Sequence, residues 1–351
     1  MRRLPIYFLI DVSESMVGEP IQMVEEGMAT IIKELRTDPY ALETVWVSII
    51  VFAGQPKTLT PLQEVITFYP PKFPIGSGTS LGDGLGHLMF ELKKNIVKTT
   101  ADTKGDWKPI VFLFTDGTPT DDTRAAITEW RSKWKTGANM VAVSLGDDSN
   151  LAMLKELTEN VLLMKDTSPE KLKSFFKWVT ASIKTSSLSV EKNSTGFELA
   201  LLDKNVVEKV PDNVAPVNTS NLDPNFVVLS AKCQNTKKPY LVKYKLHTSP
   251  VEIGGMSMSS RHYRLQGAYN VNTDYYELVN ENAAPAGKIN TEELMGFPAC
   301  PSCGNQFGVA VCQCTKIHCC GNEEITTCPW CGNTAKYGTG EGGFDLNRQL
   351  G

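Results

Sequence analysis

The chain has 351 residues and a formal net charge of -4 at pH 7. This length exceeds one ordinary hydrophobic core, so two or three domains are expected. The slight acidic balance leaves no excess of cations to neutralise phosphates, which argues against a general nucleic-acid or anionic-membrane binder. The first apolar run ends at Asp11, too early for a signal peptide, and no later run reaches the roughly 18 residues of a membrane span. We therefore expect a cytoplasmic protein without a membrane span.

The first half of the chain alternates short apolar runs with stretches of helical periodicity. Strands are predicted at residues 5–11, 44–54, 108–117, 139–147 and 161–166, and helices at residues 19–38, 80–98, 123–137, 151–161 and 168–187. Alternating strands and helices form a mostly parallel sheet that is covered on both faces. The sequence thus predicts a doubly wound, Rossmann-like α/β domain over residues 1–186.

The second half has a different pattern. Residues 187–225 are rich in proline and asparagine and are predicted to be a linker or β-rich connector. Short β-like segments follow, such as residues 225–233 and 240–248, and a small zinc-ribbon-like module with a cysteine cluster at 300–331 completes a region that we place at 226–338. The last residues, 339–351, are expected to be a flexible tail.

Hard oxygen ligands follow the strands of the first domain. Asp11 ends the first strand and Asp116 ends the third, while Ser13 and Ser15 occupy alternate positions of the turn after Asp11. Thr79 lies in a glycine-rich turn at the start of a predicted helix. Residues just beyond the carboxyl ends of the strands of such a sheet share one rim, which we expect to face solvent. Two carboxylates and three hydroxyls suit Mg²⁺ or Mn²⁺.

This set of ligands indicates binding more than catalysis. Two carboxylates leave a divalent cation with an open position that attracts a further carboxylate. Each residue alone is equally explained as a turn cap. A haloacid-dehalogenase-type phosphatase has a second aspartate where Ser13 stands, and the glycine-rich turn at residues 76–82 lacks the Gly-Lys-Ser/Thr ending of a P-loop.

These residues resemble the von Willebrand factor A domain with its metal-ion-dependent adhesion site. The resemblance covers residues 1–186 and rests on D-V-S-E-S from residue 11, on the threonine in G-S-G-T-S-L-G and on F-T-D-G from residue 114. It implies that a metal is held directly or through water, and that an Asp or Glu of a partner completes its shell. The implied ligands are Asp11, Ser13, Ser15, Thr79 and Asp116.

Eight of the nine cysteines lie between residues 300 and 331. C-P-S-C-G and C-P-W-C-G are two C-x-x-C knuckles, each followed by glycine, which is typical of zinc binding. Four thiolates make one closed structural site, so the cluster predicts one or two Zn²⁺ ions, and metal should contribute much of the folding energy of so small a segment. The predicted ligands are Cys300, Cys303, Cys312, Cys314, Cys319, Cys320, Cys328 and Cys331. His318 is an alternative ligand, and the isolated Cys233 is interpreted as an ordinary thiol.

An A domain followed by this cysteine module resembles the TerY family of bacterial tellurium-resistance and stress-response systems. The resemblance covers most of the chain and implies a carboxyl-terminal metal-binding domain from about Phe226. It also implies an adaptor that acts with a serine/threonine kinase and a PP2C-type phosphatase. The adjacent cysteines of H-C-C-G depart from the family's pattern, which leaves the choice between Cys319 and Cys320 open.

Two other functions fit the sequence less well than a metal-dependent, non-enzymatic protein-binding adaptor. A metal-dependent hydrolase or phosphatase lacks support because no H-E-x-x-H motif is present and all-thiolate zinc is usually structural. A nucleic-acid-binding zinc ribbon requires basic residues around the knuckles, whereas the segment before Cys328 is acidic.

Overall fold

The computed structural model describes residues 2–102, 104–116, 118–145, 150–164, 168–191, 199–201, 208–211, 223–253, 256–278, 287–306, 308–321, 323, 325–338 and 342–349. The chain divides into two compact units. The amino-terminal unit comprises Met1–Val12, Glu19–Phe73 and Thr79–Thr219, and the carboxyl-terminal unit comprises Ser13–Gly18, Pro74–Gly78 and Ser220–Gly351.

A seven-stranded sheet forms the centre of the amino-terminal unit, with the strand order β3-β2-β1-β4-β5-β6-β7. The pairings are parallel except at the two edges, where β3 and β7 are antiparallel. The chain moves outward from β1 in one direction and then returns to β4 on its other side, which creates a switch point between these two strands. The strands are β1 (Leu4–Asp11), β2 (Val45–Phe52), β3 (Pro56–Glu64), β4 (Ile110–Thr115), β5 (Asn139–Leu145), β6 (Val161–Met164) and β7 (Glu208–Lys209).

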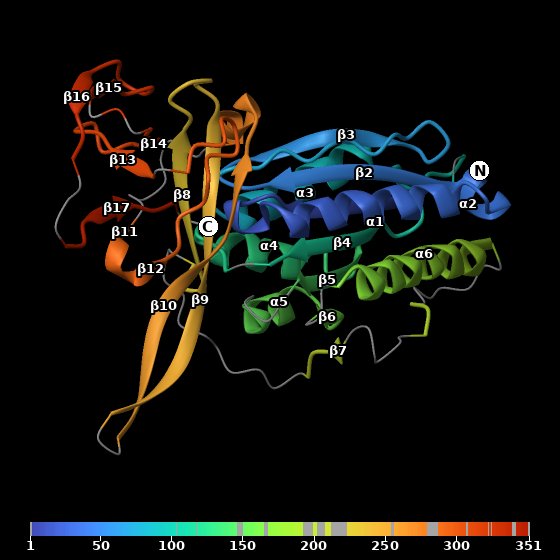
Figure 1. Cartoon of the computed structure of the whole chain (residues 1–351). Coiled ribbons are helices and arrows are strands. Elements are labelled where there is room, and N and C mark those ends of the chain that lie inside the picture. The colour runs from blue at the N-terminus through green and yellow to red at the C-terminus, as the bar shows by residue number, and fades with distance from the viewer. Residues whose placement is uncertain are drawn as a thin grey trace. The chain divides into compact units, whose positions relative to one another are not determined.

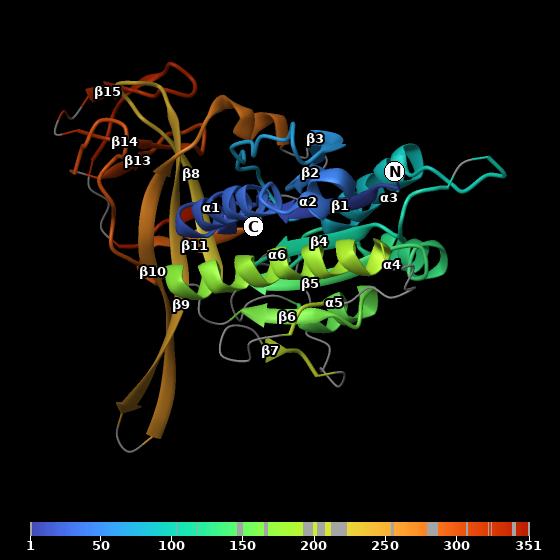
Figure 2. The same ribbon diagram turned by 90° about the vertical axis from the view of Figure 1, so that its right-hand side faces the viewer.

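Helices cover both faces of this sheet, as the uniformly apolar central strands require. On one face, α1 and α6 pack beside each other (Figure 2), and Phe114 of β4 contacts Phe175 of α6 with ring centroids 6.1 Å apart. On the other face, Leu9 of β1 shares a core with α3 and α4. The predicted doubly wound fold is confirmed. The helices are α1 (Glu19–Leu35), α2 (Pro39–Thr44), α3 (Leu81–Asn95), α4 (Arg124–Lys133), α5 (Leu151–Leu157) and α6 (Pro169–Glu191).

The sequence patterns do not predict α2 or β3. Strand β3 contains Pro56 and Pro61 and alternates poorly, so its sequence lacks the usual strand signal. An edge strand tolerates proline because one row of its backbone groups has no ladder partner. Most of the connector predicted at 187–225 lies outside the described residues, although α6 extends to Glu191 and β7 pairs with β6.

A six-stranded sheet, in the order β12-β10-β9-β8-β14-β13, forms the centre of the carboxyl-terminal unit. Figure 1 shows its long hairpin of β9 and β10. Two small sheets, β11-β17 and β15-β16, accompany it, and the predicted β-rich region is confirmed. The strands are β8 (Phe226–Lys232), β9 (Pro239–Ile253), β10 (Met256–Asn270), β11 (Lys288–Asn290), β12 (Leu294–Met295), β13 (Val309–Val311), β14 (Ile317–Cys319), β15 (Ile325–Thr327), β16 (Thr334–Lys336) and β17 (Asp345–Asn347). The short 3-10 helices are η1 (Glu14–Met16), η2 (Thr273–Leu278) and η3 (Thr291–Glu293).

The prediction of a flexible tail at residues 339–351 was wrong. Within it, β17 pairs antiparallel with β11, and Leu346 is 1% exposed in the core of the unit. The physical reason is the alternation of Asp345, Leu346 and Asn347, which places one apolar side chain inward between two outward polar ones.

In the described parts of the chain, no helix combines the length and the apolar character that crossing a bilayer requires.

The close packing of α1 on α6 generates a stability prediction. A Cβ added at the buried Gly27 of α1 would lie 2.0 Å from the ring of Phe176, which is itself enclosed by other aromatic rings. Gly27→Ala should therefore destabilise the amino-terminal unit by about 1–3 kcal/mol through overpacking. The matched control is Gly86→Ala on the exposed side of α3, where a Cβ meets nothing within 4 Å. It should stabilise by roughly 0.5–1 kcal/mol. Urea unfolding measures both, and equal effects of the two substitutions would contradict this packing.

Candidate metal centres

Two turns with the same hydrogen bonds carry the C-x-x-C pairs. In the first turn, the Cys300 N–H donates to the carbonyl of Asn305, and the Gly304 N–H donates to the carbonyl of Cys300, both at 2.8 Å. The turn at residues 328–333 repeats this pattern at 2.9 and 3.0 Å. Gly304 has a φ of 72°, and its counterpart in the second turn has a φ of 78°. Each knuckle therefore ends in a backbone conformation that glycine adopts without strain.

Two further cysteines begin similar turns that contain no glycine. The Cys233 N–H donates to the carbonyl of Lys238 at 2.8 Å, and the Lys237 N–H donates back to Cys233 at 3.0 Å. Cys312 forms the corresponding pair of bonds in a turn that is one residue shorter, at residues 312–316. In the described chain, the only non-glycine residues with positive φ are Lys237, at 60°, and Thr315, at 64°, one in each turn. Such strain persists where the surrounding structure demands it and often marks a functional site.

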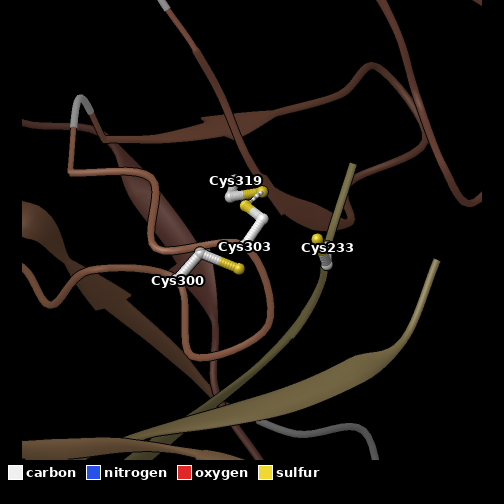
Figure 3. A group of neighbouring side chains, drawn as sticks. All are labelled: Cys233, Cys300, Cys303 and Cys319. Atoms are coloured by element: carbon white, nitrogen blue, oxygen red, sulfur yellow. Dashed lines mark hydrogen bonds between the residues drawn. The ribbon is translucent and has the colours of Figure 1, made fainter. Parts of the chain in front are cut away.

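The first group of thiols consists of Cys233, Cys300, Cys303 and Cys319, whose sulfur atoms lie within 4.8 Å of one another. Cys319 ends β14, which runs parallel to β8 in the register Ile317 with Ala231, so Cys233 just beyond β8 lies level with it. The knuckle at Cys300 and Cys303 supplies the other two thiols, and Figure 3 shows the four side chains around a common centre.

The second group consists of Cys312, Cys314, Cys328 and Cys331, again with all sulfur atoms within 4.8 Å. Here the 312–316 turn faces the second knuckle. The Sγ atoms of Cys312 and Cys331 are 3.6 Å apart, and those of Cys314 and Cys328 are 3.9 Å apart. The two turns thus contribute two thiols each.

These distances fit zinc. Four sulfurs at about 2.3 Å from a tetrahedral Zn²⁺ lie roughly 3.8 Å from one another. The Sγ atoms of Cys303 and Cys319 are 3.8 Å apart, and the pairs of the second group bracket the same value. All nine cysteines are free thiols, and their separations are far longer than the roughly 2.0 Å of a disulfide. Each group therefore has the donors and the size of a closed tetrathiolate zinc site.

Backbone amides point at several of the sulfurs. The N–H groups of Gln234, Thr236 and Trp330 donate to the Sγ atoms of Cys319, Cys233 and Cys328 at 3.2, 3.3 and 3.4 Å respectively. Four thiolates around Zn²⁺ retain two negative charges, so donors of this kind stabilise the loaded site.

The thiols of the second group titrate unequally without a cation. Hydrogen bonding from the backbone of Cys314 lowers the pKa of Cys312 to about 6, whereas burial raises the pKa of Cys314 to about 12. Neighbouring thiols in such a cluster retain protons because several thiolates cannot lie together uncompensated. Zinc binding must displace these protons, so acidification should release the metal.

The observed groups correct the predicted ligand set. Cys233, which we interpreted as an ordinary thiol, belongs to the first group, and Cys320 belongs to neither. Successive side chains of a strand point to opposite sides, so Cys320 turns away from the sulfur of Cys319 and its Sγ contacts the carbonyl of Gly321 at 3.5 Å. His318 is also outside both groups, and its buried ring packs edge-on against Tyr337. The only sequence signal for Cys233 was the polar turn C-Q-N-T-K-K.

The structure places three of the five predicted adhesion-site residues in the amino-terminal unit. Asp11 ends β1 and Asp116 follows β4 directly, so both lie at the switch point of the sheet. The hydroxyl of Thr115 donates to Oδ2 of Asp11 at 2.7 Å, which fixes that carboxylate. Thr79 lies two residues before α3, as predicted.

Ser13 and Ser15 belong to the carboxyl-terminal unit, where their hydroxyl oxygens are 2.9 Å apart. In the same unit, Lys243 donates to the carbonyl of Ser15 and the hydroxyl of Tyr275 donates to Glu14 at 2.6 Å. We expected a rim that faces solvent, whereas all five predicted residues are at most 4% exposed.

The assignment of Cys233 as a ligand, in place of the predicted Cys320, can be tested with one substitution at each position. Protein purified under reducing conditions should contain two zinc equivalents, and Cys233→Ser should lower the first site's affinity about 10-fold or more because one charged ligand is lost. Cys320→Ser is the matched control and should retain both equivalents. Elemental analysis after dialysis against a chelator measures the difference. Zinc loss from the Cys320 variant, with full retention in the Cys233 variant, would reverse the assignment.

Among solved structures, the chain is similar to proximal thread matrix protein 1 from the mussel byssus, with 19% identity over 52% of this chain and 48% of that chain and a TM-score of 0.39. The same mussel protein with a zinc-occupied MIDAS motif is 19% identical over 51% of this chain and 46% of that chain, with a TM-score of 0.36. The ArnB paralog VWA2 from Sulfolobus acidocaldarius is 12% identical over 81% of this chain and 70% of that chain, with a TM-score of 0.38. This chain spans about half the length of the mussel protein. No curated protein matches the sequence.

Two protein families match separate parts of the chain. Residues 6–178 match the von Willebrand factor type A domain, and residues 223–351 match the TerY-C metal binding domain. The second range contains all nine cysteines, and both thiol groups lie within it. The chain is therefore a TerY-like protein in which a von Willebrand factor A domain is followed by a TerY-C metal-binding domain.

Proposed function

We propose that this protein is a non-enzymatic adaptor that binds a partner protein through a divalent metal at the adhesion site of its A domain. Mg²⁺ or Mn²⁺ would be held by the oxygen ligands predicted from the sequence, Asp11, Ser13, Ser15, Thr79 and Asp116. The observation that carries this proposal is the placement of Asp11 and Asp116 at the carboxyl ends of the two strands that flank the switch point.

Donor chemistry explains why the ligand would be acidic. Near-octahedral coordination leaves positions beside the two carboxylates for water or for a partner's oxygen. A carboxylate oxygen is the hard, anionic donor that Mg²⁺ and Mn²⁺ prefer over a neutral group in such a position. The chemical class that fits is therefore a protein with a protruding Asp or Glu.

The zinc ligand sets support a role without catalysis. A catalytic zinc keeps one coordination position for water or substrate, whereas each thiol group offers four protein ligands. The residue two positions after Asp11 is Ser13, so an aspartate-based phosphoryl transfer has no partner carboxylate at that place. In this proposal the zinc ions shape the carboxyl-terminal unit, and the adhesion metal binds the partner.

The wider setting of the proposal follows from the family. A TerY-like chain would act in a bacterial tellurium-resistance or stress-response system in the cytoplasm, and a serine/threonine kinase and a PP2C-type phosphatase are proposed partners.

Removal of one carboxylate tests the adhesion metal. Asp11→Asn should leave the fold intact because it preserves shape, and it relieves repulsion between two carboxylates in the metal-free site. In the wild type, Mn²⁺ at 100 times its Kd stabilises the domain by about 2.7 kcal/mol, which corresponds to roughly 5–10 °C in Tm. The variant should lose this increase.

The matched control is Asp122→Asn, which removes an exposed carboxylate that pairs only locally with Arg124. Its Tm should rise with Mn²⁺ as in the wild type. Thermal melts of the three zinc-loaded proteins, with and without Mn²⁺, measure the effect. An equal Mn²⁺-dependent increase in wild type and Asp11→Asn would show that Asp11 is only a turn residue.

A further inference from the structure

The loop that follows Asp116 is bonded to the turn that carries Thr79. The Thr79 N–H donates to the hydroxyl oxygen of Thr120 at 2.9 Å, and the Thr120 N–H donates to the carbonyl of Thr79, also at 2.9 Å. Both residues lie in the amino-terminal unit. Two reciprocal bonds of this kind fix the position and the orientation of one backbone segment on the other, although the residues are far apart in sequence.

The next residue of the loop caps helix α3. Oδ2 of Asp121 accepts a hydrogen bond from the Asp83 N–H at 3.1 Å, in the first turn of the helix. Ser80, the local N-cap residue, makes no side-chain capping bond. The first N–H groups of a helix need acceptors from outside, and an acidic group there also interacts favourably with the helix dipole. Asp121 thus supplies from a distant loop the cap that the helix's own sequence does not.

This capping requires close approach of the two segments. A Cβ at Gly82 would lie 2.8 Å from Oδ2 of Asp121 and 3.0 Å from the carbonyl of Asp122, so only glycine fits there. Burial raises the pKa of Asp121 to about 6, while the N–H groups of Asp83 and Gly82 lower it. One oxygen of this carboxylate, Oδ1, is buried without a hydrogen-bond partner in the described structure. The fold therefore holds the Asp121 carboxylate at the start of α3 although burial removes water from one of its oxygens.

We propose that Thr120 and Asp121 are positioning residues of the adhesion site. They hold the turn of Thr79 against the loop of Asp116, so that the threonine hydroxyl and the aspartate carboxylate keep a fixed relation when the metal binds. Neither residue is itself a metal ligand. This inference rests on the proposed function, because it explains how two of the proposed ligands are preorganised by the amino-terminal unit alone.

The affinity of the zinc-loaded chain for Mn²⁺, measured by isothermal titration calorimetry at neutral pH, tests the proposal. Thr120→Val keeps the shape of the side chain but leaves the Thr79 N–H without its acceptor, and it should weaken Mn²⁺ binding about tenfold. Thr120→Ser restores the acceptor and should bind within about twofold of the wild type. A role limited to packing would not distinguish the two variants in this way.

Asp121→Ala and Asp122→Ala form a second matched pair. Both remove one carboxylate from the same loop, but only Asp121 bonds to the start of α3. Asp121→Ala should weaken Mn²⁺ binding several-fold, and Asp122→Ala should leave it unchanged. Wild-type affinity in both Thr120→Val and Asp121→Ala would overturn the positioning role and leave the proposed function standing. Absence of Mn²⁺ binding to the wild type would overturn both.

Discussion

Two sets of four thiols that share one small region impose the main constraint on the carboxyl-terminal unit. The groups are interleaved in sequence, because Cys312 and Cys314 of the second group lie between Cys303 and Cys319 of the first. Closing the first site therefore fixes the ends of the segment that carries Cys312 and Cys314, and closing the second site fixes the ends of the segment that carries Cys319. Cys233 connects the first site to β8, so the metal joins the cysteine-rich turns to the central sheet. A metal that closes loops in this way contributes folding free energy to each segment that it joins.

The A domain is built on a different principle. Its sheet is stabilised by apolar residues on both faces, and the proposed oxygen ligands lie after the ends of β1 and β4 and before the start of α3. Oxygen ligands select hard cations and sulfur ligands select zinc, so the two kinds of site distinguish their metals by donor chemistry. Loss of the adhesion metal should then leave the fold intact, whereas loss of zinc should unfold the segments that it connects. The proposed function thus assigns partner binding and stability to different metals in the same chain.

The sequence predicted what depends on local pattern. The parallel strands of the sheet, the turns after Asp11 and Thr115, and the two glycine-ended knuckles all have short-range signals. Cys233 was missed because its turn reaches positive φ at Lys237 instead of at a glycine, and because its partners are distant in sequence. The cap of α3 by Asp121 was invisible for the same reason, since Asp121 lies 38 residues beyond the Asp83 N–H that it accepts from. The burial of the adhesion residues and the pairing of β17 are tertiary properties that no local pattern reports.

The all-thiolate character of both zinc sites is the central claim of this account, and zinc K-edge X-ray absorption of the intact protein tests it most directly. Two sites with four cysteine ligands each predict an average first shell of four sulfur atoms at about 2.3 Å, without nitrogen or oxygen. A first shell that contains a histidine nitrogen at about 2.0 Å would show that His318 replaces one of the thiols and would contradict the assignment of Cys233.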